Sequence, residues 1–195
     1  MKRIVFLLAV LLASVPTFAK VYDFESNDLG WNEFADKEKG EVLIKEGVLS
    51  IEGKTDESGL LSSTCYLPID VTKSFEIKID AFAKKIKEDA GFGVIFNYRD
   101  IYNYERFLMT ETYVVYQRFE NGQLAGERYD RIKFRKNKKA QISMLLKKSF
   151  DTVTFIVDDV QVLEIPYVDY RYRGFGLFAI GKQVITFDNL ETIIK

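Results

Sequence analysis

The chain contains no histidine and only one cysteine, Cys65, among its 195 residues. Without an imidazole, neither a Ser-His-Asp triad nor a Cys-His pair can shuttle a proton near neutral pH. Histidine-ligated zinc is excluded as well, and one cysteine cannot supply the missing ligands. One cysteine also allows no disulfide within the chain, so we expect Cys65 to be a buried, inert thiol in a domain stabilised by its core.

Long apolar runs are missing after residue 19, so nothing there is long enough to cross a bilayer as a helix. The chain begins with the basic pair Lys2-Arg3, an apolar stretch over residues 4–15, and small residues at 17 and 19. This layout is typical of a secretory signal peptide. We predict a signal peptide over residues 1–19 and one exported domain over residues 20–195, with no membrane span after cleavage. The final location is a periplasm, the cell surface or the medium.

The chain has no large excess of acidic or of basic residues. The whole chain has a formal net charge of −1, with 28 basic and 29 acidic residues, and removal of Lys2 and Arg3 leaves 26 against 29, or −3. A mildly acidic domain lacks the electrostatic footprint of a nucleic-acid binder, so we expect no nucleic-acid partner. Lys and Arg do gather between residues 128 and 139. This cluster is a patch for an anionic glycan or a phosphate-rich surface or, as we favour, an exposed strand end and loop whose charges discourage edge pairing.

What the chain has instead is β-strand patterning throughout. Apolar and polar residues alternate over Ser74–Ala83, as in a half-buried strand, and the apolar run Gly91–Asn97 predicts a strand buried on both faces. The two-residue polar segments Glu46-Gly47, Asn121-Gly122 and Asp158-Asp159 each separate two apolar runs, which predicts tight β-hairpin turns. Short strands at such intervals, about twelve or thirteen in all, favour an all-β fold: a two-sheet antiparallel β-sandwich or jelly roll.

Three blocks of the sequence resemble the laminin-G-like jelly rolls of the concanavalin A-like lectin/glucanase superfamily. The first block leads from Phe24–Trp31 into Val42–Glu52, and the second is Gly91–Gly122, which opens with GFGVIFN. The third contains the G-x-G-L-F strand at Gly174–Phe178 and ends on Phe187–Leu190, with the sequence FDNL. The resemblance implies two antiparallel sheets, one of them curved, with the two chain ends side by side.

The sequence departs from the enzymes of that superfamily. Members that hydrolyse β-glucans carry an E-x-D-x-x-E strand, and no such triplet occurs here. We therefore predict that the chain is not an enzyme. The alternative is a carboxylate-based glycoside hydrolase whose acids come from distant strands, for instance Asp100 with Glu127. It requires two carboxyl groups about 5–5.5 Å apart for retention, or about 6.5–9.5 Å for inversion.

Tyrosines interleave with arginines through the central third of the chain. Aromatic rings cover the apolar face of a sugar, while charged and amide groups bind its hydroxyls, so this pattern favours a glycan ligand. A protein of the cell envelope is the alternative partner, and the competing interpretation of the rings is that half of them pack inside the sandwich. Trp31 is expected in the core or at its lip. The predicted ligand-binding residues are Tyr102, Tyr104, Arg106, Tyr116 and Arg118.

The resemblance also implies a structural cation. Terminal strands of such domains commonly neighbour each other, which brings Asp23 near the start of the chain toward Asp188 near its end. Clusters of hard oxygen ligands suit Ca²⁺, so these two aspartates are the candidate ligands of a structural calcium, and we expect no other cofactor. The alternative is that Asp188-Asn189 only shapes a turn or satisfies backbone donors.

Overall fold

The computed structural model describes residues 18–56, 59–83, 90–132 and 140–195, which form fifteen β-strands and no α-helix. No helix in these ranges is long and apolar enough to cross a membrane. Nine strands form the larger sheet: β1 (Phe18–Tyr22), β2 (Phe34–Asp36), β3 (Gly40–Lys45), β4 (Val48–Gly53), β6 (Phe75–Ala83), β11 (Ala140–Ser149), β12 (Thr152–Val157), β13 (Val160–Pro166) and β15 (Val184–Ile194). Six form the smaller sheet: β5 (Leu60–Tyr66), β7 (Phe92–Asp100), β8 (Asn103–Met109), β9 (Tyr113–Glu120), β10 (Gln123–Arg131) and β14 (Gly174–Ile180).

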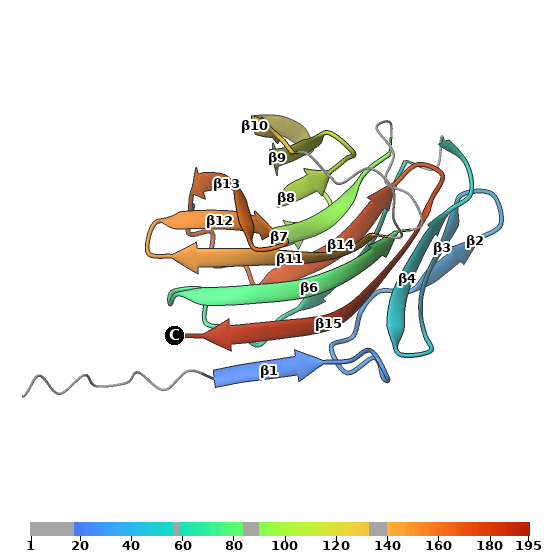
Figure 1. Cartoon of the computed structure of the whole chain (residues 1–195), viewed down its shortest axis with the longest axis horizontal. Helices are drawn as coiled ribbons and strands as arrows, with labels where there is room; N and C mark the ends of the chain where they lie inside the picture. The colour runs from blue at the N-terminus through green and yellow to red at the C-terminus, as the bar shows by residue number, and fades with distance from the viewer. Residues whose placement is uncertain (1–17, 57–58, 84–89, 133–139) are drawn as a thin grey trace, which may run out of the picture.

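Every strand pairing in the two sheets is antiparallel, and the predicted β-sandwich is confirmed (Figure 1). The larger sheet runs β13-β12-β11-β6-β15-β4-β3-β2, and the smaller one runs β10-β9-β8-β7-β14-β5. β1 pairs with the second half of β15, beyond the part that β4 occupies, and Phe18 lies opposite Ile194. The terminal strands are therefore neighbours, as the resemblance implies. Of the predicted signal peptide, residues 1–17 lie outside the described residues, and Phe18 and Ala19 begin β1.

The sequence patterns account for the local structure. Burial alternates along β6, while Phe92–Asn97 is buried on both faces, so both strand predictions are confirmed. The hairpins at Glu46-Gly47, Asn121-Gly122 and Asp158-Asp159 are confirmed as well, and all six of these residues have positive φ. Positive φ at both central residues is the geometry of the two-residue turn whose twist matches antiparallel strands. The structure contains more strands than predicted, in part because β2 has three exposed residues and no alternation to detect.

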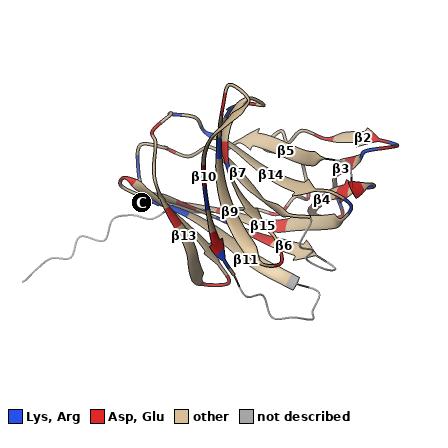
Figure 2. Cartoon of the chain, turned by 90° about the horizontal axis from the view of Figure 1, so that it is seen from above, with Lys and Arg blue, Asp and Glu red and all other residues tan. Residues whose placement is uncertain are grey.

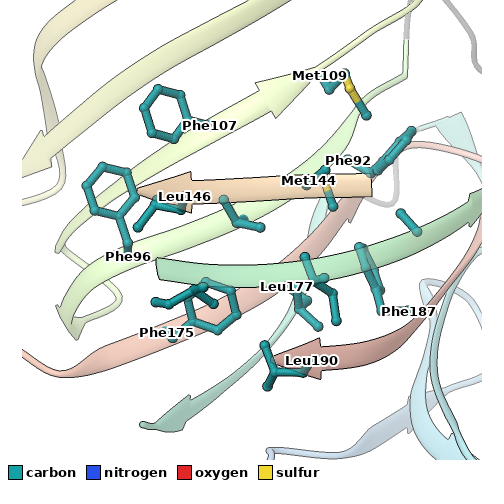
Figure 3. Packing of buried hydrophobic residues seen from close by; sticks show 14 of the residues in the cluster. Phe92, Phe96, Phe107, Met109, Met144, Leu146, Phe175, Leu177, Phe187 and Leu190 are labelled. Carbon is teal, nitrogen blue, oxygen red and sulfur yellow. The ribbon is translucent and has the colours of Figure 1, made fainter. Parts of the chain in front are cut away.

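The core lies between the two sheets, where side chains from both inner faces interdigitate (Figure 3). Phe107 on β8 stacks on Phe155 on β12, with ring centroids 4.6 Å apart and an interplanar angle of 5°. Trp31 is buried between Phe24 and Phe175, at centroid distances of 5.7 and 6.3 Å, and so belongs to the core. This contact ties the segment after β1 to the six-stranded sheet.

Charged residues of both signs are interspersed over the molecule (Figure 2). Of the basic cluster, Arg128 and Arg131 are exposed on β10, an edge strand, and residues 133–139 lie outside the described residues. Among the residues that the structure describes, one cation is buried: Lys148 donates to the carbonyl oxygens of Val71 and Lys73 at 3.0 and 2.9 Å. The interior of the sandwich therefore contains a charged group as well as apolar side chains.

Candidate functional site

A pocket of about 340 Å³ lies at one end of the six-stranded sheet, where β7 ends, β8 begins and β9 ends. The connection between β13 and β14, residues 167–173, supplies another wall. Ligand pockets in proteins typically enclose about 300–1,000 Å³, so this volume suits a small ligand or one part of a larger one. We call this site the end pocket, and its lining residues are Asn97, Arg99, Asn103, Tyr104, Glu105, Arg118, Phe119, Glu120, Asn121, Tyr170 and Tyr172.

The most deeply buried carboxyl group of the end pocket belongs to Glu105, which is only 2% exposed. Asn97 donates from Nδ2 to Oε1 of Glu105 at 3.0 Å, and the Tyr116 hydroxyl donates to Oε2 at 2.6 Å. Burial raises the pKa of Glu105, against the two hydrogen bonds, which lower it. Burial likewise raises the pKa of Tyr116, and the adjacent Glu105 carboxylate raises it further. The carboxyl group is therefore fixed in place by neighbours on both sides.

Two side-chain hydrogen bonds attach the 167–173 connection to β7 and β9. The Tyr170 hydroxyl donates to Oε1 of Glu120 at 3.0 Å, and Nδ2 of Asn97 also donates to the carbonyl oxygen of Val168 at 3.4 Å. Oε1 of Glu120 lies 3.3 Å from Nε of Arg118 as well, an ionic contact without hydrogen-bond alignment. The connection is thereby held against β7 and β9.

Two pairs of aromatic rings line the end pocket. Tyr104 stacks on Phe119 with centroids 4.8 Å apart, and Tyr170 stacks on Tyr172 at 6.0 Å. The guanidinium carbon of Arg99 lies 5.8 Å from the centroid of the Tyr172 ring. Each pair presents flat apolar surface next to polar groups, which is the combination that recognises a sugar ring or another amphipathic ligand.

The two hairpin turns beside the pocket are bonded to each other. Oδ1 of Asp100 accepts hydrogen bonds from the backbone of Tyr102 and from Nδ2 of Asn103, at 2.8 and 2.9 Å. Oδ1 of Asn103 in turn accepts from the backbone of Asn121 at 3.0 Å. These hydrogen bonds lower the pKa of Asp100, the bond from Asn103 most. The β7–β8 and β9–β10 turns are thus held in a fixed arrangement beside the pocket.

A second set of aromatic and polar side chains covers the outer surface of β8, β9 and β10. Alternate residues of these strands, such as Phe107 and Tyr116, join the core, so their neighbours face away from it. Tyr129 is 70% exposed and meets Tyr113 edge-on at 6.0 Å, and the guanidinium of Arg131 lies 5.6 Å from the Tyr113 ring. We call this surface the aromatic face, and its residues are Tyr104, Arg106, Tyr113, Gln117, Phe119, Glu127, Tyr129 and Arg131.

A chain of hydrogen bonds crosses the aromatic face. Arg106 on β8 donates to Oε1 of Gln117 on β9, from Nε at 2.8 Å and from Nη2 at 2.6 Å. Gln117 donates from Nε2 to Oε1 of Glu127 on β10 at 2.7 Å. The Arg106 guanidinium also lies 5.0 Å from the ring of Phe119 and 5.4 Å from that of Phe178. The polar groups are therefore held at fixed positions beside aromatic surface.

The five ligand-binding residues predicted from the sequence are divided between three places. Tyr104 opposes Phe119 and Arg106 opposes Gln117, so the first of each pair lies on the aromatic face. Tyr116 is buried beneath the end pocket and Arg118 lines it, while Tyr102 is 57% exposed in the β7–β8 turn. Tyr104 also lines the pocket. The interleaving of tyrosine and arginine in the sequence did not predict several residues of the end pocket and the aromatic face. These residues are Glu105, Tyr113, Gln117, Phe119, Glu127, Tyr129, Tyr170 and Tyr172.

The acid pair suggested by the sequence for a hydrolase is not brought together. Asp100 is at the end of β7 and Glu127 is on β10, with β8 and β9 between them. Three strand spacings amount to about 14 Å, beyond the separations that glycoside hydrolysis uses. The carboxyl groups that do share a pocket are those of Glu105 and Glu120.

Of the two aspartates predicted to hold calcium, Asp23 follows β1 and Asp188 belongs to β15, the strand that pairs with β1. Oδ1 of Asp23 accepts from the backbone of Glu25 at 3.2 Å, and Oδ1 of Asp188 accepts from the backbone of Asn189 at 2.6 Å. The side chain of Asn189 donates to Asp80. In the part of the chain that the structure describes, no three or more Asp, Glu, His or Cys side chains are grouped to hold a metal ion. The calcium site stays a prediction.

Solved structures with this fold include both binding modules and enzymes. The carbohydrate-binding module CBM66 from Bacillus subtilis matches with a TM-score of 0.55 and 16% identity, over 83% of this chain and 94% of its own. The CBM2 module of the evolved Dit protein of Lactobacillus casei BL23 phage J-1 matches with a TM-score of 0.60 and 13% identity, over 92% and 98%. Apo Crh5 transglycosylase matches with a TM-score of 0.58 and 12% identity, over 92% and 83%. No protein-family profile and no curated protein sequence matches the chain.

These likenesses establish the architecture. At 16% identity or less, they show that the chain has the β-sandwich fold of carbohydrate-binding modules. One fold hosts many functions, so the function must be argued from the side chains of the site.

Proposed function

We propose that the chain is an exported, non-catalytic module that binds a glycan on its aromatic face. The observation that carries the proposal is the row of hydrogen-bonded polar groups from Arg106 through Gln117 to Glu127, flanked by the exposed ring of Tyr129 and by half-buried aromatic rings. The rings cover the apolar C–H faces of sugar residues, and the polar row binds their hydroxyl groups. The fold supports the same function, since it is shared with carbohydrate-binding modules.

The arrangement of the aromatic face suits binding because it is formed before a ligand arrives. Side chains already held by hydrogen bonds lose little conformational freedom on binding, which favours affinity. Arg106 is held between two rings and bonded twice to Gln117, and Tyr113 is held between Arg131 and Tyr129. This surface is also part of three adjacent strands, which are more rigid supports than loops.

The absence of catalysis is part of the proposal. The two carboxyl groups that share the end pocket are both engaged: Glu105 accepts from Asn97 and Tyr116, and Glu120 accepts from Tyr170. A hydrolase needs one carboxyl group that gives a proton to the leaving oxygen and a second that attacks or activates water. Carboxyl groups that already accept hydrogen bonds from the protein's own donors are better suited to holding the pocket in shape.

Export is supported by the sequence alone. We propose cleavage after Ala19, which leaves the last three residues of β1, Lys20 to Tyr22, paired with β15. Mass spectrometry of the protein secreted by its host cell tests this step. A chain that begins at Lys20 supports export with cleavage, and a chain that keeps residues 1–19 contradicts it.

A glycan-array screen of the purified protein, followed by titration of each hit, tests the binding function. We expect Tyr129→Ala and Gln117→Ala to lower the affinity for the hits about tenfold or more, because buried aromatic and hydrogen-bond contacts dominate most interfaces. Phe150→Ala is the matched control, because that ring is 89% exposed in a turn of the other sheet. An array without hits would redirect the search to a protein partner of the envelope, and hits unaffected by both substitutions would show that the glycan does not bind on the aromatic face.

A further inference from the structure

The end pocket is enclosed on two sides. Its walls come from the end of β7, the start of β8, the end of β9 and the 167–173 connection. The connection is attached to Glu120 and Asn97 by hydrogen bonds, and the two turns are linked through Asn103. The three strand ends are adjacent in one sheet and form one side of the pocket, and the 167–173 connection forms the other. A volume of about 340 Å³ between them suits one sugar residue better than the middle of a chain.

The end pocket and the aromatic face have two residues in common. Tyr104 and Phe119 line the pocket and stack on each other, and Phe119 also lies 5.0 Å from the guanidinium of Arg106. Arg106 starts the row of polar groups on the aromatic face. Glu105 and Arg118 of the pocket pair with each other on the inner face of the sheet, and Arg106 and Gln117 pair on the outer face, so the two sites meet only at Tyr104 and Phe119.

The charges of the pocket are balanced by the protein itself. Nε of Arg118 lies 3.3 Å from Glu120, and Nε of Arg99 lies 3.6 Å from Asp100. An anionic ligand would compete with these carboxylates for the two arginines, and a cationic ligand would meet both arginines. What the lining offers to a neutral ligand is a set of amide, hydroxyl and ring groups from Asn97, Asn103, Asn121, Tyr170 and Tyr172. Groups of this kind suit sugar hydroxyls.

From the volume, the covering 167–173 connection and the balanced charges, we infer that the end pocket binds the uncharged terminal sugar residue of a glycan chain. This inference rests on the proposed function and deepens it, because it names chain ends as the ligand class and excludes chains that end in a uronic acid.

The test uses single sugars, which are small enough to occupy the pocket alone. Backbone NMR spectra of the protein are recorded with glucose, galactose, mannose and fructose, and with glucuronic and galacturonic acid. We expect at least one neutral sugar to shift resonances of Asn97–Glu105, Arg118–Asn121 and Tyr170–Tyr172. The uronic acid related to that sugar should bind about tenfold more weakly or worse, because the arginines already face carboxylates.

Two variants separate the pocket from the face. Tyr172→Ala is expected to weaken the neutral sugar about tenfold, while Tyr172→Phe, which keeps the ring, retains most of the affinity. Tyr129→Ala changes only the aromatic face and should leave the affinity for the single sugar unaltered. The NMR map of the unmodified protein needs no variant, so it decides the location even if Tyr172→Ala folds poorly.

The outcomes distinguish this inference from the proposed function. Shifts confined to the aromatic face, equal or tighter binding of the uronic acid, or array hits that bind without any neutral sugar entering the pocket would each overturn the inference. All three would leave glycan binding intact. Failure of the array and of every single sugar together would overturn both proposals.

Discussion

The hydroxyl group of Tyr116 donates a 2.6 Å hydrogen bond to Oε2 of Glu105, and both side chains are buried beneath the end pocket. The bond joins β9 to β8 on the inner face of the sheet. Together with the bond from Asn97 to Oε1, it fixes the carboxyl group at the bottom of the candidate site. The same contact makes the stability of the protein depend on the protonation state of Glu105.

The first prediction concerns Glu105→Gln and pH. Burial raises the pKa of Glu105 in the folded state above its ordinary value of 4.5. The folded state therefore binds the proton more tightly than the unfolded state, so the stability from this group is present below pH 4.5 and is lost as pH rises through the folded pKa. Glutamine removes this dependence. We expect the unfolding free energy of Glu105→Gln, relative to the unmodified protein, to increase from acidic to neutral pH in urea titrations. A difference that is flat or decreases contradicts the burial effect.

The second prediction concerns Tyr116→Phe, which removes only the hydroxyl donor. The Oε2 atom of Glu105 then stays buried without a partner, a loss that costs about 1–3 kcal/mol in unfolding free energy. The cost should be greater at neutral pH than at acidic pH, because the charged carboxylate needs the donor more than the protonated form does. Urea titrations at two pH values measure both numbers. Equal stability of the two proteins at neutral pH would show that the bond contributes nothing.

How far the sequence predicts the site depends on the register between β8 and β9. Thr110 and Tyr113 are bonded across a two-residue turn, which places Tyr104 opposite Phe119 and pairs even residues of β8 with odd residues of β9. The turn residues, Glu111 and Thr112, carry no glycine or asparagine to announce a hairpin. The register therefore cannot be predicted from the sequence. Without the register, Arg106 and Arg118 fall into one predicted site, although their side chains lie on opposite faces of the sheet.

Other features were predictable because a local rule decides them. The three hairpin turns contain residues that tolerate positive φ, and the alternation in β6 reports its half-buried position. The contribution of Tyr170 and Tyr172 follows no such rule, because their connection reaches the pocket only through hydrogen bonds to distant strands. Tertiary contacts of this kind leave no periodic signal in the sequence.

The third prediction tests the contact between the two sheets. Phe155→Ala removes a ring that is fully buried and stacked on Phe107 at 4.6 Å. Replacing a buried phenylalanine with alanine typically costs about 3–5 kcal/mol, because apolar contacts are lost and a cavity is left. Phe150→Ala is the control with the same change in chemistry on an exposed ring, and it should alter the unfolding free energy by about 0.5 kcal/mol or less. Similar losses for both variants would contradict the assigned core.

The fourth prediction concerns the close approach of β7 and β8. A Cβ atom at Gly93 would lie 1.9 Å from the carbonyl oxygen of Phe107, so Gly93→Ala forces these strands apart. At Gly126 on β10, the nearest atom to a Cβ is 3.8 Å away, which is ordinary contact. We expect a loss of about 1–3 kcal/mol for Gly93→Ala and little change for Gly126→Ala, measured by urea unfolding. A Gly93→Ala protein as stable as the unmodified one would contradict the close spacing of β7 and β8.

The fifth prediction concerns the single cysteine. Burial raises the pKa of Cys65 to about 12, from an ordinary value of 9.0. Because the thiolate is the reactive species, the folded protein at pH 8 should react with a disulfide reagent roughly a thousandfold more slowly than the unfolded protein. A variant with Cys65→Ala and Tyr66→Cys moves the thiol one residue along β5 to an exposed position, and it should react quickly when folded. Rapid modification of the folded, unmodified protein would show that Cys65 is accessible, and its role as an inert core residue would have to be abandoned.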